Sequence, residues 1–224
     1  MVQLFGAKNS DQLFSFDENV EENVEQIEPF LTQEQCELVA THGAGHVVVS
    51  YLLNPDGELY NLKISDNENE EHRIHPVFEE NDYQTRYDLM NQIKVSFGGM
   101  VAEEFFYGEM SKLCQIDLEN CTRIAAQMVG SFGMGKSLVS YGTSHDVAND
   151  LVLCVLNNAQ CRDEVDRILT MCKNDTRSIL DNNRLMIREI RTALLEKNEL
   201  NHDDLLKLIW SVKNANGQDD NQEI

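Results

Sequence analysis

The sequence predicts a mainly α-helical domain with a small β-sheet. Apolar residues recur at helical spacing over long stretches, and strand-like alternation is confined to one short segment, "ELYNLKIS" at 58–65. A chain of 224 residues is long enough for one sizeable core, and no internal repeat divides it. We therefore expect a single helical domain with loosely attached ends.

The first predicted helix covers residues 33–53. Thr32 and Gln35 form a T-x-x-Q capping box at its start, since each side chain can bond the other residue's backbone N–H. "NPDG" at 54–57 has the residues of a turn and ends the helix. The segment 58–65 follows as the predicted strand.

Helical periodicity resumes after the acidic, proline-containing stretch 66–84, whose ends we expect to be solvated loop. Over residues 86–108 the apolar face repeats every four residues, and Gly98 and Gly99 allow another backbone to approach closely. Further helices are predicted over residues 116–133, 146–174, 175–196 and 202–213. Asn201 is the expected N-cap of the last one.

The two ends of the chain differ in composition from the part between them. Residues 1–31 are predicted to be an acidic N-terminal arm, and residues 214–224 a flexible polar tail. The folded domain is expected over 32–213.

Composition argues against two classes of partner and for one compartment. The net charge of −21 opposes binding to nucleic acid and to anionic membranes. No apolar run approaches the roughly 20 residues of a membrane span, and no secretion signal is visible, so a soluble protein is expected. The six cysteines form no C-x-x-C pair, which favours a reducing, cytoplasmic location.

The segment "ATHGAGHVVVSYLL" at 40–53 carries two histidines at helical spacing. His42 and His46 lie one turn apart on one helix face, so both rings can reach a single ion such as zinc. The alternative is that two unrelated histidines have this spacing by accident, because the pattern alone is short.

The same segment resembles the H-E-A-G-H helix of the peptidase domain of FtsH-type ATP-dependent zinc metalloproteases. "FGGMVAEEFFYGEMS" at 97–111 is similar to the G-G-R-A-A-E-E segment of that family, and "DLENCTRIAAQMVGSFGM" at 117–134 to its N-D-L-E-x-A-T segment. "EVDRIL" and "ALLEKNEL" resemble its C-terminal helices. The resemblance covers residues 32–212 in the family's order, and it implies an FtsH-type zinc metallopeptidase domain.

The resemblance also implies a set of metal ligands: His42, His46 and Asp117, with zinc as the ion. This set leaves a fourth tetrahedral position for water, as in catalytic zinc sites. Asp117 taken alone is a plausible N-cap of the helix that follows it. "SKLCQI" at 111–116 replaces small residues of the family, which brings Lys112 and Cys114 near the metal. Cys114 is an alternative ligand to Asp117.

Gly43 stands where the family has the glutamate that acts as general base. Losing a positioned base costs on the order of 10²- to 10⁴-fold in rate, so we expect zinc binding with little or no proteolysis. Candidate substitute bases are Glu103, Glu104, Glu119, His72 and His75, each more simply explained as a solvated or structural group. The alternative function is a pseudo-peptidase that binds a protein partner. Natural loss and deliberate inactivation both fit Gly43.

The family also implies partners. Its members carry a membrane anchor and an ATPase module ahead of the peptidase domain and assemble as hexameric rings. Without those modules we expect either an excised peptidase domain or one that works with an ATPase in trans on unfolded protein or peptide. A homo-oligomeric ring is a further expectation.

"GSFGMGKS" at 130–137 matches the P-loop pattern G-x-x-x-x-G-K-[ST]. A working P-loop lies between a buried strand and a helix, whereas this segment follows a predicted helix and leads into "LVSYG". We therefore interpret it as the loop that ends a helix, with Lys136 as a solvated charge.

Overall fold

The computed structural model describes residues 31–59, 61–64, 83–141 and 148–219. In chain order the elements are α1 Gln33–Leu53, β1 Leu62–Lys63, α2 Arg86–Tyr107, α3 Cys114–Gly130, α4 Ala148–Asn157, α5 Ala159–Asp181, α6 Arg184–Lys197, β2 Glu199–Leu200 and α7 His202–Asp219. The predicted fold class, mainly α with a small sheet, is confirmed. The candidate bases His72 and His75 lie outside the described residues.

Helices α1 and α2 pack against each other at a pair of glycines. A Cβ placed on Gly45 would lie 2.2 Å from the carbonyl oxygen of Gly98, and one on Gly98 would lie 2.7 Å from the carbonyl oxygen of Gly45. Such contacts are far too short for a real side chain, so both positions need glycine. The close approach of another backbone that was predicted at Gly98 and Gly99 is therefore present at Gly98.

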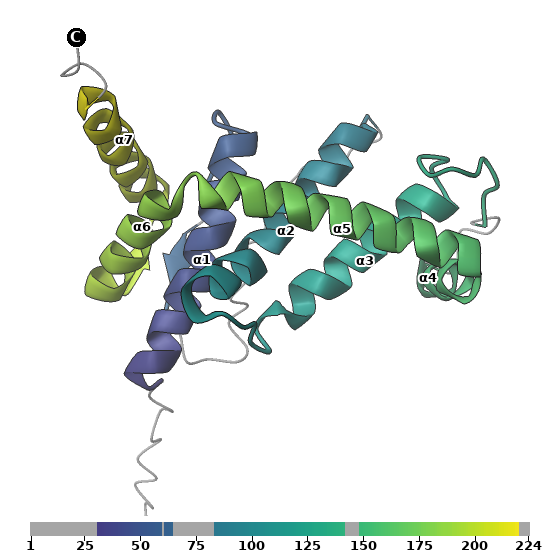
Figure 1. Ribbon diagram of the computed structural model, residues 1–224, viewed down its shortest axis with the longest axis horizontal. Coiled ribbons are helices and arrows are strands. Elements are labelled where there is room, and N and C mark those ends of the chain that lie inside the picture. Colours follow the sequence, from purple (N-terminus) through teal and green to yellow (C-terminus); the bar gives the residue numbers. More distant parts are fainter. Residues whose placement is uncertain (1–30, 60, 65–82, 142–147, 220–224) are drawn as a thin grey trace, which may run out of the picture.

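The long helix α5 crosses one face of the layer made by α1, α2 and α3 (Figure 1). Its apolar side chains close the core from that face, as Ile168 and Leu180 are fully buried there. Helix α6 continues the cover over α1 and leads to α7 at the end of the molecule.

The sheet has two short antiparallel strands, in which Leu62 pairs with Leu200 and Lys63 with Glu199. The predicted strand 58–65 is thus in the right place but shorter than expected. Its partner, β2, joins α6 to α7. The sheet therefore links the segment after α1 to the C-terminal helices.

Several predicted helix boundaries were correct, and others were wrong. The Thr32–Gln35 capping box and the bounds of α1 are as predicted, and Asn201 caps α7 by accepting a hydrogen bond from the backbone N–H of Asp204. The predicted helix 146–174 is instead broken at Asn158, whose side chain accepts from the Cys161 N–H and starts α5.

The break predicted between residues 174 and 175 does not exist. Helix α5 continues to Asp181, since buried Thr176 bonds the carbonyl oxygens of Lys94 and Cys172 inside the fold. At the C-terminal end, α7 reaches Asp219 and so extends into the segment predicted as a flexible tail.

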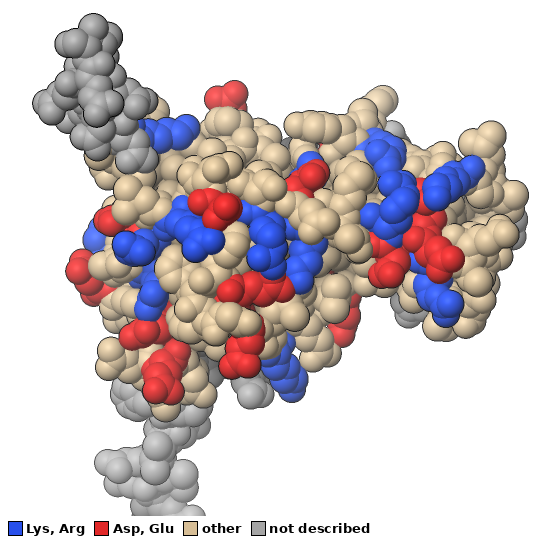
Figure 2. Space-filling model, in the orientation of Figure 1, with Lys and Arg blue, Asp and Glu red and all other residues tan. Residues whose placement is uncertain are grey.

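Basic side chains on the face shown in Figure 2 lie next to acidic ones rather than in a continuous positive area. Lys173 and Arg177 of α5 both pair with Glu104 of α2, and Arg191 of α6 pairs with Glu37 of α1. These pairs tie the covering helices to the layer beneath. Among the described helices, none is long and apolar enough to cross a bilayer.

Candidate metal centre

His42 and His46 lie one turn apart on α1, in the buried part of the helix, which packs against α2. Their ring centroids are 4.6 Å apart in an edge-to-face arrangement. His46 is almost fully buried, whereas the side chain of His42 is 12% exposed. Among the described residues, the pair is therefore more open on the side of His42 than on that of His46.

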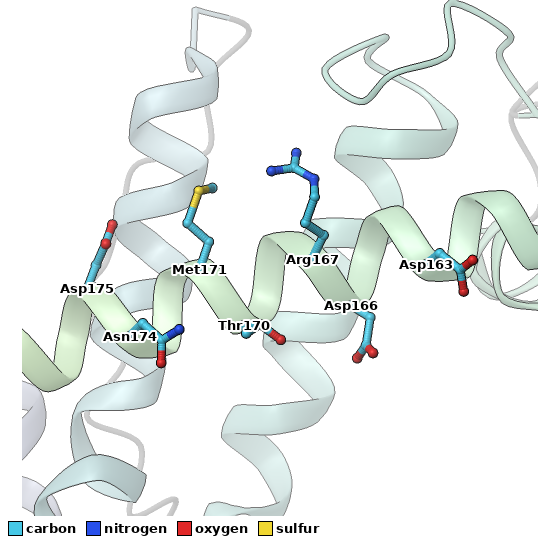
Figure 3. A pocket seen from close by; sticks show the side chains of 7 residues that line it. All are labelled: Asp163, Asp166, Arg167, Thr170, Met171, Asn174 and Asp175. Carbon is cyan, nitrogen blue, oxygen red and sulfur yellow. The ribbon is translucent and has the colours of Figure 1, made fainter.

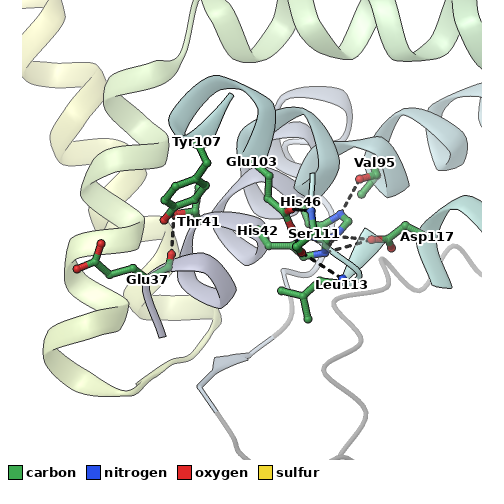
Figure 4. A network of polar contacts seen from close by, with 10 residues as sticks. All are labelled: Glu37, Thr41, His42, His46, Val95, Glu103, Tyr107, Ser111, Leu113 and Asp117. Carbon is green, nitrogen blue, oxygen red and sulfur yellow. Dashed lines mark hydrogen bonds and ion pairs between the residues drawn. The ribbon is translucent and has the colours of Figure 1, made fainter. Parts of the chain in front are cut away.

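Asp117 of α3 faces both rings (Figure 4). Its Oδ2 lies 3.1 Å from Nε2 of His42 and 3.3 Å from Nε2 of His46, and the two Nε2 atoms are 2.9 Å apart. The three predicted site residues are thus brought together. The N-cap interpretation of Asp117 is wrong, because α3 begins at Cys114 and Asp117 lies inside the helix.

The far edge of each ring is held by a group of α2. Nδ1 of His42 lies 2.7 Å from Oε1 of Glu103, and Nδ1 of His46 lies 2.7 Å from the carbonyl oxygen of Val95. Both partners accept hydrogen bonds, which assigns the ring proton to Nδ1 in each histidine. Glu103 is fully buried and also accepts from the N–H and the hydroxyl of Ser111.

When each ring carries its proton on Nδ1 alone, each Nε2 presents a lone pair to the other and to the Asp117 carboxylate. Three electron-rich atoms in contact are stabilised by a cation between them, which can be a proton on one Nε2 or a metal ion. In a tetrahedral zinc site with bonds near 2.0–2.1 Å, ligand atoms are about 3.3 Å apart. The observed separations of 2.9 to 3.3 Å fit this set, and a carboxylate or carbonyl behind each ligating histidine is the usual arrangement.

The same contacts shift the proton affinities of the cluster. Burial disfavours the charged form of His42, but its interactions with Asp117, Cys114 and Glu103 outweigh burial and hold the pKa of His42 well above its ordinary value. Burial likewise opposes ionisation of Asp117, but His46 and His42 outweigh it and lower the pKa of that carboxyl. A metal ion therefore competes with a proton for the Nε2 of His42.

Gly99 of α2 makes room for the His42 ring. A Cβ placed there would lie 2.5 Å from both Cε1 and Nε2 of that ring. Two contacts therefore restrain the ring: the backbone of Gly99 lies against it, and its Nδ1 is hydrogen-bonded to Glu103.

Three of the candidate substitute bases, Glu103, Glu104 and Glu119, lie in the described part of the chain. Each of them is already bonded to other side chains. Glu103 is occupied by His42 and Ser111, and Glu104 by the two basic residues of α5. Glu119 is exposed and accepts from Gln115 on the surface of α3. Lys112 is also exposed, whereas Cys114 is buried and close to His42.

The P-loop-like segment has the structural context predicted for a false match. It follows α3 rather than a strand, and residues 131–141 contain no helix. Lys136 is solvated as expected, with its side chain 77% exposed, and its Nζ lies 3.3 Å from Oε2 of the buried Glu164. That carboxylate also binds Arg167, so Lys136 is part of an ion-pair group.

A surface pocket lies along α5 and is separate from the metal centre (Figure 3). Its lining residues all come from that helix: Asp163, Asp166, Arg167, Thr170, Met171, Asn174 and Asp175. Two of them are engaged elsewhere, since Arg167 binds Glu164 and Asp175 binds Lys94. We assign this pocket no chemical role.

Comparison with known proteins defines the class of this fold and site. Residues 29–208 match the model of peptidase family M41, and the chain belongs to that family. It is similar to the ATP-dependent zinc metalloproteases FtsH of Caldicellulosiruptor bescii, with 27% identity over 80% of this chain and 31% of the relative, and of Bacillus subtilis, with 26% identity over 80% and 30%. The FtsH of Endomicrobium trichonymphae is 25% identical over 92% of this chain and 35% of its own length. The chain therefore spans about a third of these relatives.

The sequence did not indicate the outer partners of the histidines. Glu103 was considered only as a substitute base, and a backbone carbonyl such as that of Val95 leaves no mark in a sequence. The signal that could have identified Glu103 is a carboxylate that directly follows the apolar residues Val101 and Ala102, both fully buried on α2. A buried carboxylate requires a hydrogen-bonding partner.

Proposed function

We propose that this chain is a zinc-binding peptidase domain in which His42, His46 and Asp117 are the metal ligands. The observation that carries the proposal is the contact of the two Nε2 atoms and Asp117 Oδ2, at 2.9 to 3.3 Å, with the Nδ1 of each ring held by an acceptor of α2. A bound zinc ion would supply Lewis-acid polarisation of a peptide carbonyl and acidification of water.

We further propose that the domain hydrolyses peptide bonds slowly or not at all, because Gly43 stands at the position of the general base. Glycine has no group that can take a proton from water. Glu103, the buried carboxylate behind His42, is already hydrogen-bonded to His42 and Ser111, which supports a holding role instead. The expected deficit is about 10²- to 10⁴-fold relative to a chain with a base at this position.

A pseudo-peptidase function is the second candidate. It is favoured by the same glycine, since a ligand set that persists without a base suits binding better than turnover. In this case the domain would hold a protein partner without cutting it.

If the domain is an active peptidase, its proposed partners are those that the family resemblance implies. The substrate would be an unfolded protein or peptide. The relatives are named ATP-dependent, which supports cooperation with an ATPase, in trans if no such module belongs to this chain. Assembly in a ring is a further proposal, drawn from the family resemblance. A cytoplasmic location is supported by the six cysteines, all of which are free.

The test is a comparison of casein or unfolded-peptide cleavage by the zinc-loaded parent and a Gly43→Glu variant. Gly43→Gln is the matched control, because it adds the same bulk without a base. A gain of about 10²-fold or more in Gly43→Glu alone supports a disabled peptidase. Silence in all three chains, with zinc bound in each, rejects it in favour of the pseudo-peptidase. A parent that cleaves as fast as Gly43→Glu refutes the role assigned to this position.

A further inference from the structure

We propose that Ser111 is a positioning residue of the metal centre. It holds the Glu103 carboxylate behind the ring of His42, and it begins the turn that leads into α3. The inference rests on the proposed function, because it takes His42, His46 and Asp117 as the metal ligands. Ser111 acts on these ligands through their supports and is not one of them.

Two donors of Ser111 hold the Glu103 carboxylate. The backbone N–H of Ser111 donates to Oε2 of Glu103 at 2.5 Å, and its hydroxyl donates to Oε1 at 3.1 Å. The same Oε1 accepts the Nδ1 proton of His42 at 2.7 Å. Both oxygens of this fully buried carboxylate are therefore engaged, and it cannot rotate relative to the His42 ring without breaking a hydrogen bond to Ser111 (Figure 4).

The direction of the Ser111 hydroxyl is fixed from its other side. Its Oγ accepts a hydrogen bond from the backbone N–H of Leu113 at 3.1 Å. Because this bond uses a lone pair of the oxygen, the hydroxyl proton stays available for Oε1 of Glu103. The serine therefore donates to a side chain of α2 while it accepts from the segment that enters α3.

Ser111 also shapes the start of the helix that carries the third proposed ligand. Its carbonyl oxygen accepts from the backbone N–H of Cys114, the first residue of α3, and its hydroxyl closes a local turn with Leu113. Asp117 lies in the first turn of that helix. One residue thus bonds the support of His42 and also fixes the backbone from which Asp117 reaches the rings.

A serine that only shaped this turn would affect the stability of the fold and leave the metal affinity unchanged. A positioning role requires that its hydroxyl change metal affinity through Glu103. Outer partners of metal-ligating histidines contribute about 10- to 100-fold to affinity. Ser111 acts one hydrogen bond further out and keeps its backbone bond to Glu103 in any variant, so we expect about 10-fold, the low end of that range.

The test measures the affinity of the full, reduced chain for Zn²⁺ by chelator competition, together with the stability of each variant in urea. Ser111→Ala should weaken zinc binding about 10-fold, and Ser111→Thr, which keeps the hydroxyl, should restore it. Asn158→Ala is the control for stability, because it removes the cap bond of α5 and should leave zinc affinity unchanged. If Ser111→Ala does not fold, Ser111→Gly removes the same hydroxyl from this loop position.

A second measurement tests the route through Glu103. In a Glu103→Gln background, Ser111→Ala should cause little further loss of zinc affinity, because both residues act on His42 through one contact. Fully additive losses overturn the inference, since Ser111 would then act by another route. A Ser111→Thr chain that binds zinc as weakly as Ser111→Ala overturns it as well, because the hydroxyl would not be the cause.

The outcomes separate this inference from the proposed function. Zinc binding that depends on His42 but is as tight in Ser111→Ala as in the parent overturns the positioning role and leaves the three-residue site standing. No zinc bound by the parent, or binding unaffected by His42→Ala, overturns the three-residue site and the inference together.

Discussion

Replacement of Gly99 by alanine tests whether the His42 ring is held where the metal centre needs it. The new Cβ would lie 2.5 Å from Cε1 and Nε2 and 2.6 Å from Nδ1 of that ring. Ordinary carbon contacts begin near 3.5 Å, so the ring must move by about 1 Å. Since Glu103 holds Nδ1 at 2.7 Å, the movement also disturbs that hydrogen bond.

A shift of this size removes Nε2 from ligand geometry, and we expect the affinity for zinc to fall by about 10- to 100-fold. Overpacking should also lower the free energy of unfolding by about 1–3 kcal/mol. Both are measurable, the first by competition with a chelating dye and the second by chemical denaturation.

Gly130→Ala is the matched control. Its Cβ would lie 2.4 Å from Cγ2 of Val155, in a part of the core remote from the ligands. It should lower stability without changing zinc affinity. If Gly99→Ala binds zinc as tightly as the parent does, the steric argument is refuted.

Three other predictions follow from single contacts. Glu103→Gln keeps the size of the side chain but removes the charge behind His42, and should weaken zinc binding about 10- to 100-fold in a chelator titration; unchanged affinity would contradict the role of Glu103. Asn158→Ala removes the cap of α5 and should cost about 1 kcal/mol in urea denaturation at unaltered zinc affinity, and no loss would show that the cap is dispensable. Hydrogen bonding to Arg167 is the main cause that lowers the pKa of Glu164, and it outweighs the opposing effect of burial. The ionised carboxylate therefore stabilises the fold fully above its unfolded pKa of about 4.5. This stabilisation is lost as the pH falls through the lower pKa of the folded state. Glu164→Gln should therefore lower the melting temperature at pH 7, with a difference that shrinks below about pH 4; a constant difference would argue against a charge effect.

Much of the fold follows from local signals in the sequence. The capping box at Thr32 fixed the start of α1, and the apolar repeat placed α2 nearly to the residue. The break at Asn158 escaped prediction although its cap bond to Cys161 is local, whereas the continuity of α5 through Thr176 involves a contact with a distant segment. Thr176 bonds the carbonyl oxygen of Lys94, which lies on another helix.

The proposed ligands could be named from the sequence, whereas their surroundings could not. The spacing of His42 and His46 permits a shared ion by helix geometry, and the family resemblance supplied Asp117. The contacts of Glu103 and Val95 with the two rings arise only once α1 crosses α2. Helix pairing is a property of the three-dimensional packing, so no periodicity in the chain encodes it directly.

Both imidazoles are backed by the same helix, α2, through Glu103 and the Val95 carbonyl. Neither ring can turn independently without breaking a hydrogen bond to that shared support. Capture of an ion would thus demand little rearrangement, and a rigid cradle of this kind discriminates by the size and bonding geometry of the incoming cation. Selectivity among divalent metals would then be set largely by how α1 and α2 cross, at a pair of glycines that never touch the ion.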